Sequence, residues 1–333
     1  MDLEPDDSQA ALRDELRRFL ADRVTSDARR AIGERPGAVD PALWGELAAM
    51  GAFTLALPED RGGVGLGWAD AVLAFEELGR AAVPGPLVGT TLAHTLSVGA
   101  ADPGPAVVGV VDAVGGTALV EHLGGLDALV VLDAGGLRVI DGEALAALAA
   151  GAAALDRPLD LLTPVSRVAR LDGGRPAGDR AVADAWRSVG GLLTAALQVG
   201  LGEGALLMGI DYARQRKQFG REIGTFQAVK HMLADAYAGI EVARSAVWSA
   251  AVQLDEAGGA AGAAEPGVVR AVAGARIVAA GAAVAAAKAN IQVHGGMGFT
   301  WDLDAHVFLK RALALDTTFG SVEAAVATMA AAL

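Results

Sequence analysis

The chain has 333 residues, of which 53% are hydrophobic and 5% aromatic, so it is not a disordered protein and its core is built mainly from Ala, Val and Leu. Its formal net charge of -13 argues against nucleic acid and against an anionic membrane surface, because both attract basic proteins. It has no cysteine, which excludes disulfides, thiolate metal sites and a cysteine nucleophile. The start, residues 1–9, is acidic and polar, unlike a signal peptide, and the most apolar stretch, 277–287, is too short to span a bilayer. We therefore expect a cytoplasmic protein.

The first hundred residues show helical periodicity. Apolar residues at spacings of three and four predict four helices, over residues 10–20, 41–50, 68–78 and roughly 87–98. Between the second and third lies a loop full of turn residues, 57–65. We assign residues 1–100 to an N-terminal helical domain.

The next segment is typical of short strands. Runs rich in Val, Leu and Ile, bounded by Gly and Asp clusters, predict strands over residues 106–111, 117–123, 128–132 and 137–140, with a further strand over 165–171. Their close spacing favours a meander. We assign residues 101–178 to a small β domain.

Long helical periodicity then returns. Apolar residues recur at alternating gaps of three and four from Val229 to Leu254, and the opposite side carries Lys230, Asp235, Glu241 and Arg244. A second Ala-rich helix is predicted over 266–293. Residues 179–333 therefore form a helical bundle, and the order helices, sheet, helices predicts an α+β fold that is mainly α.

Most signatures of catalysis are absent. The chain has no Walker A loop, no G-x-S-x-G elbow and no H-E-x-x-H, and Gly200-x-Gly202 is better explained by close helix packing. Asp302-x-Asp304-x-His306 has metal-ligand residue types, but acidic residues at a helix start are the better interpretation. We predict no metal site.

Two breaks between long helices are more specific. Residues 212–220 contain Arg216 and end in glycine, and residues 291–300 contain Gln292 and several glycines. Glycines let backbone N–H groups approach a phosphate-like anion, and an arginine can form a forked contact with it. On spacing alone, a helix–helix turn with a surface arginine remains the simpler interpretation.

Four motifs in the same order resemble the acyl-CoA dehydrogenase family. Residues 212–235 read Y-A-x-x-R-x-Q-F-G-x-x-I-x-x-F-Q-x-x-x-H-x-L-A-D, and residues 292–298 read Q-V-H-G-G-M-G. Residues 51–65 match G-[FA]-x-x-L-x-x-P-E-x-x-G-G-x-G, and residues 76–80 match E-E-[LI]-G-R. The motifs lie near both ends of the chain, so chance is a poor explanation for them.

The resemblance implies an N-terminal helical domain, a small β domain and a C-terminal four-helix bundle. It also implies FAD bound between subunits and oxidation of the Cα–Cβ bond of an acyl-CoA, in which a glutamate removes the α-proton and the flavin accepts the β-hydride. In such enzymes these motifs contact the ADP half of an FAD whose ring lies in the neighbouring subunit. The resemblance carries that role to Arg216, Gln218, Phe219, Ile223, Phe226, Gln292, Val293 and Gly296.

The chain departs from the family at the base. Alignment from Gln292 puts Phe319 where most members have the catalytic glutamate, and the alternative base position falls on Gly190. Neither side chain can accept a proton, so we predict no catalytic residue. The flavin-facing T-E-x-x-x-G-S-D and W-[IV]-[TS]-N segments are also absent, and the only tryptophan nearby is Trp186.

These departures lead to a hypothesis. Residues 298–306 resemble the G-F-T-W-E-x-D-A-H of actinobacterial heteromeric enzymes for steroid side chains. We therefore expect the small subunit of an α2β2 acyl-CoA dehydrogenase for a bulky substrate, with the base and flavin pocket on a paralogous partner and an electron-transfer flavoprotein or similar acceptor.

Two alternatives remain open. One is a self-sufficient homotetramer that uses Glu256 or Glu203 as the base. The other is a scaffold or acyl-CoA-binding subunit without flavin, against which the retained Arg216, Phe219 and Gln292 argue, because a scaffold has no need of ADP contacts.

Overall fold

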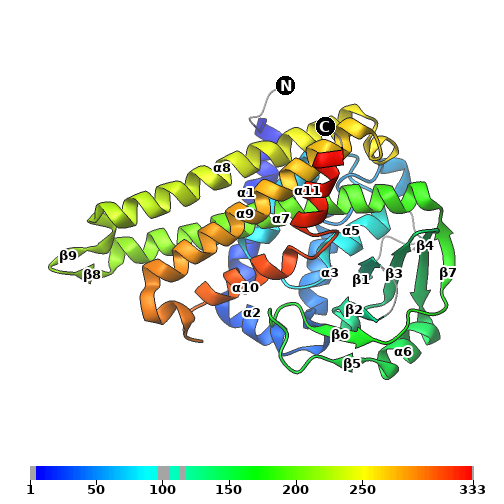
Figure 1. Cartoon of the computed structure of the whole chain (residues 1–333), viewed down its shortest axis with the longest axis horizontal. Coiled ribbons are helices and arrows are strands. Elements are labelled where there is room, and N and C mark those ends of the chain that lie inside the picture. Colours follow the sequence, from blue (N-terminus) through cyan, green and yellow to red (C-terminus); the bar gives the residue numbers. More distant parts are fainter. Residues whose placement is uncertain (1–4, 97–105, 113–116, 332–333) are drawn as a thin grey trace.

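The computed structural model describes residues 5–96, 106–112 and 117–331, and its N-terminal part is helical (Figure 1). All four predicted helices are confirmed, although residues 97 and 98 lie outside the described part. Helix α2 was not predicted from the sequence; Thr25 caps it by accepting a hydrogen bond from the Ala28 N–H. The elements are α1 (Asp7–Arg23), α2 (Ser26–Gly33), η1 (Pro36–Ala38), α3 (Pro41–Ala49), η2 (Glu59–Arg61), α4 (Trp68–Arg80) and α5 (Leu87–Thr95).

The β region contains the predicted strands, but the predicted meander is wrong. Strand β1 pairs in parallel with β3, β3 pairs antiparallel with β4, and β4 with β7, whereas β2 joins β6 and β5 in a separate sheet. Alternation of apolar and polar residues predicts which face of a strand is buried. It does not predict which strand pairs with it, and this is why the meander prediction failed. The elements are β1 (Val108–Asp112), β2 (Ala118–Glu121), η3 (Leu123–Gly125), β3 (Ala128–Asp133), β4 (Gly136–Asp141), α6 (Gly142–Gly151), β5 (Ala153–Ala154), β6 (Val165–Val168) and β7 (Arg175–Gly178).

The C-terminal part is a bundle of long helices that projects away from the sheets and ends in a hairpin (Figure 1). The apolar face predicted from Val229 to Leu254 is confirmed: from Ala236 onward each of its members is buried, while Lys230 and Asp235 are exposed. The elements are α7 (Arg180–Gln215), β8 (Lys217–Gln218), β9 (Arg221–Glu222), η4 (Ile223–Thr225), α8 (Gln227–Glu256), η5 (Gly259–Gly262), α9 (Pro266–His294), η6 (Gly295–Phe299), α10 (Ala305–Leu315) and α11 (Val322–Ala331).

By length and composition alone, helices α7 and α9 are long and apolar enough to cross a membrane. The stretch 277–287 that was considered from the sequence is only a part of α9 and was too short to indicate this. Both lie at the centre of the bundle, where α9 packs against α7 and α8. Core helices of globular proteins meet the same criteria, so this finding is weak evidence for a membrane span.

Helices α4 and α7 touch backbone to backbone. A Cβ atom at Gly200 would lie 1.8 Å from the Glu76 carbonyl oxygen, and one at Gly79 would lie 2.1 Å from that of Leu197. Gly204 similarly faces the Arg80 carbonyl, at 2.4 Å. Any larger residue would therefore push the two helices apart, which confirms the packing role predicted for Gly200.

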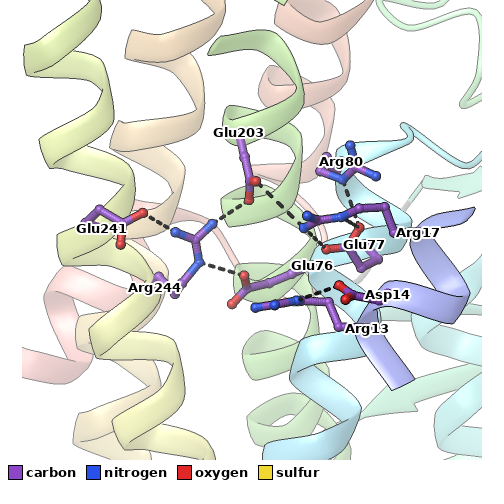
Figure 2. A network of polar contacts seen from close by, with 9 residues as sticks. All are labelled: Arg13, Asp14, Arg17, Glu76, Glu77, Arg80, Glu203, Glu241 and Arg244. Carbon is purple, nitrogen blue, oxygen red and sulfur yellow. Dashed lines mark hydrogen bonds and ion pairs between the residues drawn. The ribbon is translucent and has the colours of Figure 1, made fainter. Parts of the chain in front are cut away.

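A polar network fixes α4 to its other neighbours (Figure 2). The Glu77 carboxylate, 2% exposed, accepts two hydrogen bonds from Arg17 of α1, at 2.9 and 2.5 Å. It also accepts one from Arg80 at 2.8 Å. Two arginines therefore compensate the charge of this buried carboxylate.

The second half of the network centres on Arg244 of α8. Its guanidinium donates to Glu76 of α4 at 2.8 Å and to Glu203 of α7 at 2.5 Å, and it also contacts Glu241. Figure 2 shows these side chains converging from three helices. The E-E-L-G-R motif thus joins α4 to α1 and α8, beside its glycine contact with α7.

Removing the Glu77 charge tests this assignment. We expect Glu77→Ala to lower the free energy of unfolding by about 3 kcal/mol, because it leaves Arg17 and Arg80 without their buried partner. Urea unfolding measures the change. The matched control is Glu46→Ala, whose carboxylate pairs equally closely with Arg23 (2.7 Å) but is about 40% exposed, and which we expect to change by less than about 1 kcal/mol. Equal losses in the two variants would contradict the assignment.

His122 couples the β region to the N-terminal helices. Its ring is buried, and its Nδ1 lies 2.6 Å from the Gly37 carbonyl oxygen. Burial lowers the pKa of His122 to about 4, against the opposing effect of that hydrogen bond. The folded chain therefore holds this imidazole neutral at pH values where an unfolded chain would protonate it.

The pH dependence of stability follows from this shift. As pH falls from about 6.5 to about 4, the unfolded state gains a proton that the folded state resists, so the protein should lose up to about 3 kcal/mol of stability through this group. His122→Asn retains a donor for Gly37 and tolerates the backbone φ of 57°. Urea unfolding across this pH range should show a shallower loss in the variant, and an identical slope would rule out His122 as the source.

Candidate functional site

The first predicted segment forms a hairpin at the tip of the bundle. Helix α7 ends where the Arg216 N–H bonds the Tyr212 carbonyl at 2.9 Å, and β8 pairs with β9 through the two-residue turn Phe219–Gly220. Both turn residues have positive φ, 51° and 78°. A phenylalanine in this region is uncommon, and its ring is 92% exposed. A strained backbone that presents a bare aromatic ring indicates a site that acts on something outside the chain.

Other predicted residues support this tip. The Phe226 ring lies 6.2 Å from the Phe219 ring, edge to face. The Arg221 guanidinium lies 4.1 Å from the centre of the Phe226 ring. The Ile223 N–H bonds the Arg216 carbonyl at 2.8 Å, which closes the loop. Gln218 is exposed on β8, where its amide bonds the Lys217 carbonyl.

The second predicted segment lies beside the first. The Tyr212 ring stacks on the His294 ring at 4.1 Å, and this contact joins the end of α7 to the end of α9. Gln292 is exposed there, whereas the Val293 side chain is buried, so only its backbone can contact a ligand. After α9, Gly296 is exposed, and a Cβ atom built on it would meet nothing within 4 Å. Open space above a glycine backbone suits the close approach of a phosphate.

Charge is concentrated at this tip. Five exposed cations lie on or next to the hairpin, and none forms an ion pair with a carboxylate among the described residues. Of these, only Arg216 was assigned to the site from the sequence; their clustering in a chain of net charge -13 was the available signal. Unpaired cations and exposed glycine backbone fit the diphosphate of an ADP group. The five are Arg214, Arg216, Lys217, Arg221 and Lys230.

The two positions considered for a base meet in the structure. A Cβ atom at Gly190 would lie 2.2 Å from the Phe319 ring, so the phenyl group packs directly on the glycine backbone. Phe319 itself has a φ of 53°. One aromatic ring thus occupies the space where either carboxylate would project.

Two small cavities adjoin Phe319. One, of about 50 Å³, lies between α5, β1 and the loop after α10, and the other, of about 290 Å³, lies between β1, β2 and the same loop. The first holds only a few water molecules, far below the ~300–1,000 Å³ of a ligand pocket. The second lies at the lower end of that range, so neither cavity as it stands has room for a bulky acyl chain.

Three carboxylates are relevant to the alternative of an unconventional base. Glu203 belongs to the polar network and Glu256 is exposed at the end of α8, so neither lines the cavities at Phe319. Glu121, which the sequence analysis missed, lines both cavities, and burial raises its pKa to about 7 against the effect of Arg311. Its strand gave no signal of a functional role, because a single Glu at a strand end is ordinary.

Asp304 and His306 also have structural partners. Asp304 precedes α10 and pairs with Arg29 at 2.5 Å, and the His306 ring packs edge to face on Trp301 at 4.6 Å. Within the described ranges, no group of three His, Asp or Glu side chains is placed to hold a metal.

Sequence comparison identifies the family. Residues 6–101 match the acyl-CoA dehydrogenase N-terminal domain, and residues 188–333 match the C-terminal domain. The chain is 35% identical over 320 residues to acyl-CoA dehydrogenase IpdE2 of Mycobacterium tuberculosis, covering 92% of both, and 32% identical over 305 residues to IpdE2 of Mycolicibacterium smegmatis, covering 90% of this chain and 91% of the relative. The chain belongs to the acyl-CoA dehydrogenase family, whose cofactor is FAD.

Solved structures share the whole fold. A chain of the ChsE4–ChsE5 complex from Mycobacterium tuberculosis superposes with a TM-score of 0.81 at 24% identity, covering 99% of this chain and 98% of the other. A chain of the Tcur3481–Tcur3483 steroid ACAD superposes with a TM-score of 0.78 at 24% identity, covering 98% and 97%. The predicted fold of helices, small β region and helical bundle is confirmed.

Two adjacent glycines of α7 test the packing of Phe319. We expect Gly190→Ala to destabilise the protein by about 1–3 kcal/mol, because its methyl group overlaps the Phe319 ring. Gly191→Ala, whose nearest neighbour is a Val272 methyl at 3.3 Å, should change stability by less than about 1 kcal/mol. Thermal unfolding compares the two. In a Phe319→Ala background, Gly190→Ala should no longer lower stability, because the ring that its methyl group overlaps is gone. An equal loss of stability from Gly190→Ala in both backgrounds would refute the contact.

Proposed function

We propose that this chain is the base-lacking subunit of a heteromeric, FAD-dependent acyl-CoA dehydrogenase. The observation that carries the proposal is the Phe319 ring packed on Gly190, which leaves neither base position with a carboxylate. A paralogous partner supplies the glutamate and the pocket for the flavin ring and the acyl group. Assembly as α2β2 in the cytoplasm, with an electron-transfer flavoprotein or similar acceptor, completes the proposal.

The tip of the bundle is this chain's contribution. Bound FAD supplies the acceptor for the β-hydride of the substrate. Arg216 and the neighbouring cations neutralise the diphosphate, Phe219 and Phe226 cover its apolar edges, and Gln292 with the Gly296 backbone offers hydrogen bonds on the facing side. The eight residues named from the sequence thus have a shared role, in which Val293 acts through its backbone.

A bulky substrate is the finer part of the proposal. The Tcur3481–Tcur3483 neighbour is a steroid ACAD, and the ChsE4–ChsE5 neighbour is a complex of two different chains. A heteromer with half the number of active sites leaves room for a large acyl group beside each one. A steroid side-chain acyl-CoA is therefore the substrate class we propose.

Glu121 supports one competing function. Its carboxyl lines the cavities at Phe319, and a pKa near 7 suits a general base. If these cavities opened when the substrate binds, a self-sufficient enzyme could use Glu121 as its base. Glu121→Gln separates the two: in our proposal acyl-CoA oxidation by the complex persists, whereas a loss of about a hundredfold or more would assign the base to this chain.

Co-expression tests the proposal as a whole. We expect the chain alone to be colourless and inactive, and a yellow complex with the catalytic paralogue to oxidise acyl-CoA. Native mass and flavin absorbance give the result. A yellow homo-oligomer that is active unaided would overturn the proposal, and a colourless but stable complex would favour the scaffold alternative.

The ADP contact has a residue-level test. Because Arg216 is exposed and unpaired, Arg216→Ala should leave thermal stability unchanged but weaken FAD binding by the complex about ten- to a hundredfold, the loss typical of a charged hydrogen-bonded contact. Arg180→Ala, at the other end of the same helix, is the matched control. Equal FAD affinity in both variants would remove Arg216 from the site.

A further inference from the structure

A third cavity, with a lining distinct from that of the two at Phe319, lies between α2, the loop 160–162 and the start of α10. Its volume is about 250 Å³. The apolar part of its wall includes Leu161 and Trp301, which are 45% and 60% exposed although large apolar side chains normally pack inside. Much of the apolar surface of these two side chains is thus left uncovered by the described part of the chain.

The polar part of the wall is basic. Lys310 has no carboxylate partner among the described residues, and its ammonium lies 4.8 Å from the centre of the Trp301 ring. Arg30 adds a half-exposed guanidinium whose contacts to Asp304 and Asp27 are long, 3.4 and 3.8 Å. The cavity therefore presents two available cations beside an aromatic ring.

The acidic groups of the wall are largely neutralised. Asp304 forms an ion pair with Arg29 at 2.5 Å. Asp160 forms an ion pair with Arg311 at 3.2 Å and accepts a hydrogen bond from the Thr163 hydroxyl at 2.7 Å. Glu34, exposed at the C-terminal end of α2, is the remaining acid. A ligand in the cavity thus meets more available positive than negative charge.

A buried polar atom without a partner completes the wall. His306 is 5% exposed, and its Nδ1 is buried without a hydrogen bond to any described residue. Its ring is held edge to face on Trp301. This atom has almost no accessible surface, and the Thr300 backbone acts on the ring, so the contribution of His306 is to hold the Trp301 ring in place.

We propose that this cavity binds a small amphipathic carboxylate, with a ring or short chain against Leu161 and Trp301 and its carboxylate beside Lys310 and His306. The site is separate from the proposed flavin contact and does not depend on it. The volume limits the ligand to about one or two rings, smaller than a drug-sized molecule. Lys310 supplies the charge, and the His306 ring holds Trp301 in position beside the ligand.

Trp301 is a natural reporter of this cavity. The other four tryptophans are 4% exposed or less, so the difference in emission between the native protein and Trp301→Phe isolates this one ring, even when a partner is present. The probe is cyclohexanecarboxylate. Cyclohexylmethanol has the same shape without charge, and cyclohexylmethylammonium has the opposite charge.

We expect the carboxylate to change Trp301 emission saturably and to bind at least about tenfold more tightly than the alcohol, with no binding of the ammonium. Lys310→Met should abolish the preference for the carboxylate, whereas His306→Phe, which keeps the ring contact with Trp301, should change binding by less than about threefold. Lys288→Met, an exposed lysine of α9, should change nothing. Equal binding of carboxylate and alcohol, undiminished binding by Lys310→Met, or no change in Trp301 emission would each overturn the proposal.

Discussion

The backbone contact between α4 and α7 is the constraint on which the rest of the structure depends. Three glycines let the helices approach until carbonyl oxygens of one face the Cα atoms of the other, and side chains of any size would separate them. This distance brings the carboxylates of Glu76 and Glu77 within reach of arginines on α1 and α8 (Figure 2). Ion pairs between distant helices need such a rigid frame, because each buried charge must find its partner in one geometry.

In the proposed function, the tip of the bundle and the region of Phe319 have opposite roles. At the tip of the bundle, strained backbone, exposed aromatic rings and unpaired cations persist, although each lowers stability or solubility. The backbone of Phe319 also has a positive φ, but its ring packs on glycine inside the fold and provides no proton acceptor. Features that are unfavourable for the isolated chain are the ones a partner or cofactor explains.

Much of the fold could be predicted from the sequence, because long amphipathic helices such as α8 carry their own periodicity over many turns. The sheets could not be, since β1 and β2 look alike as strands yet belong to different sheets. The candidate site shows the same division. Arg216 and Gln292 could be assigned because they occupy recognisable motif positions. Arg221 and Glu121 could not, because only the folded structure places Arg221 among the cations of the tip and Glu121 at the cavities beside Phe319. The meeting of Phe319 with Gly190 joins positions far apart in the chain, which spacing alone does not reveal.

The length of α7 makes the bundle a lever. The helix runs from the Gly200 contact to Arg216 over 16 residues, or about 24 Å at 1.5 Å per residue. A rotation of about 5° at the contact would displace the tip by roughly 2 Å, more than a forked arginine contact tolerates. If the tip contacts the cofactor as proposed, substitutions near Gly200 will change cofactor affinity at a distance, because they reorient a tip whose own residues are unchanged.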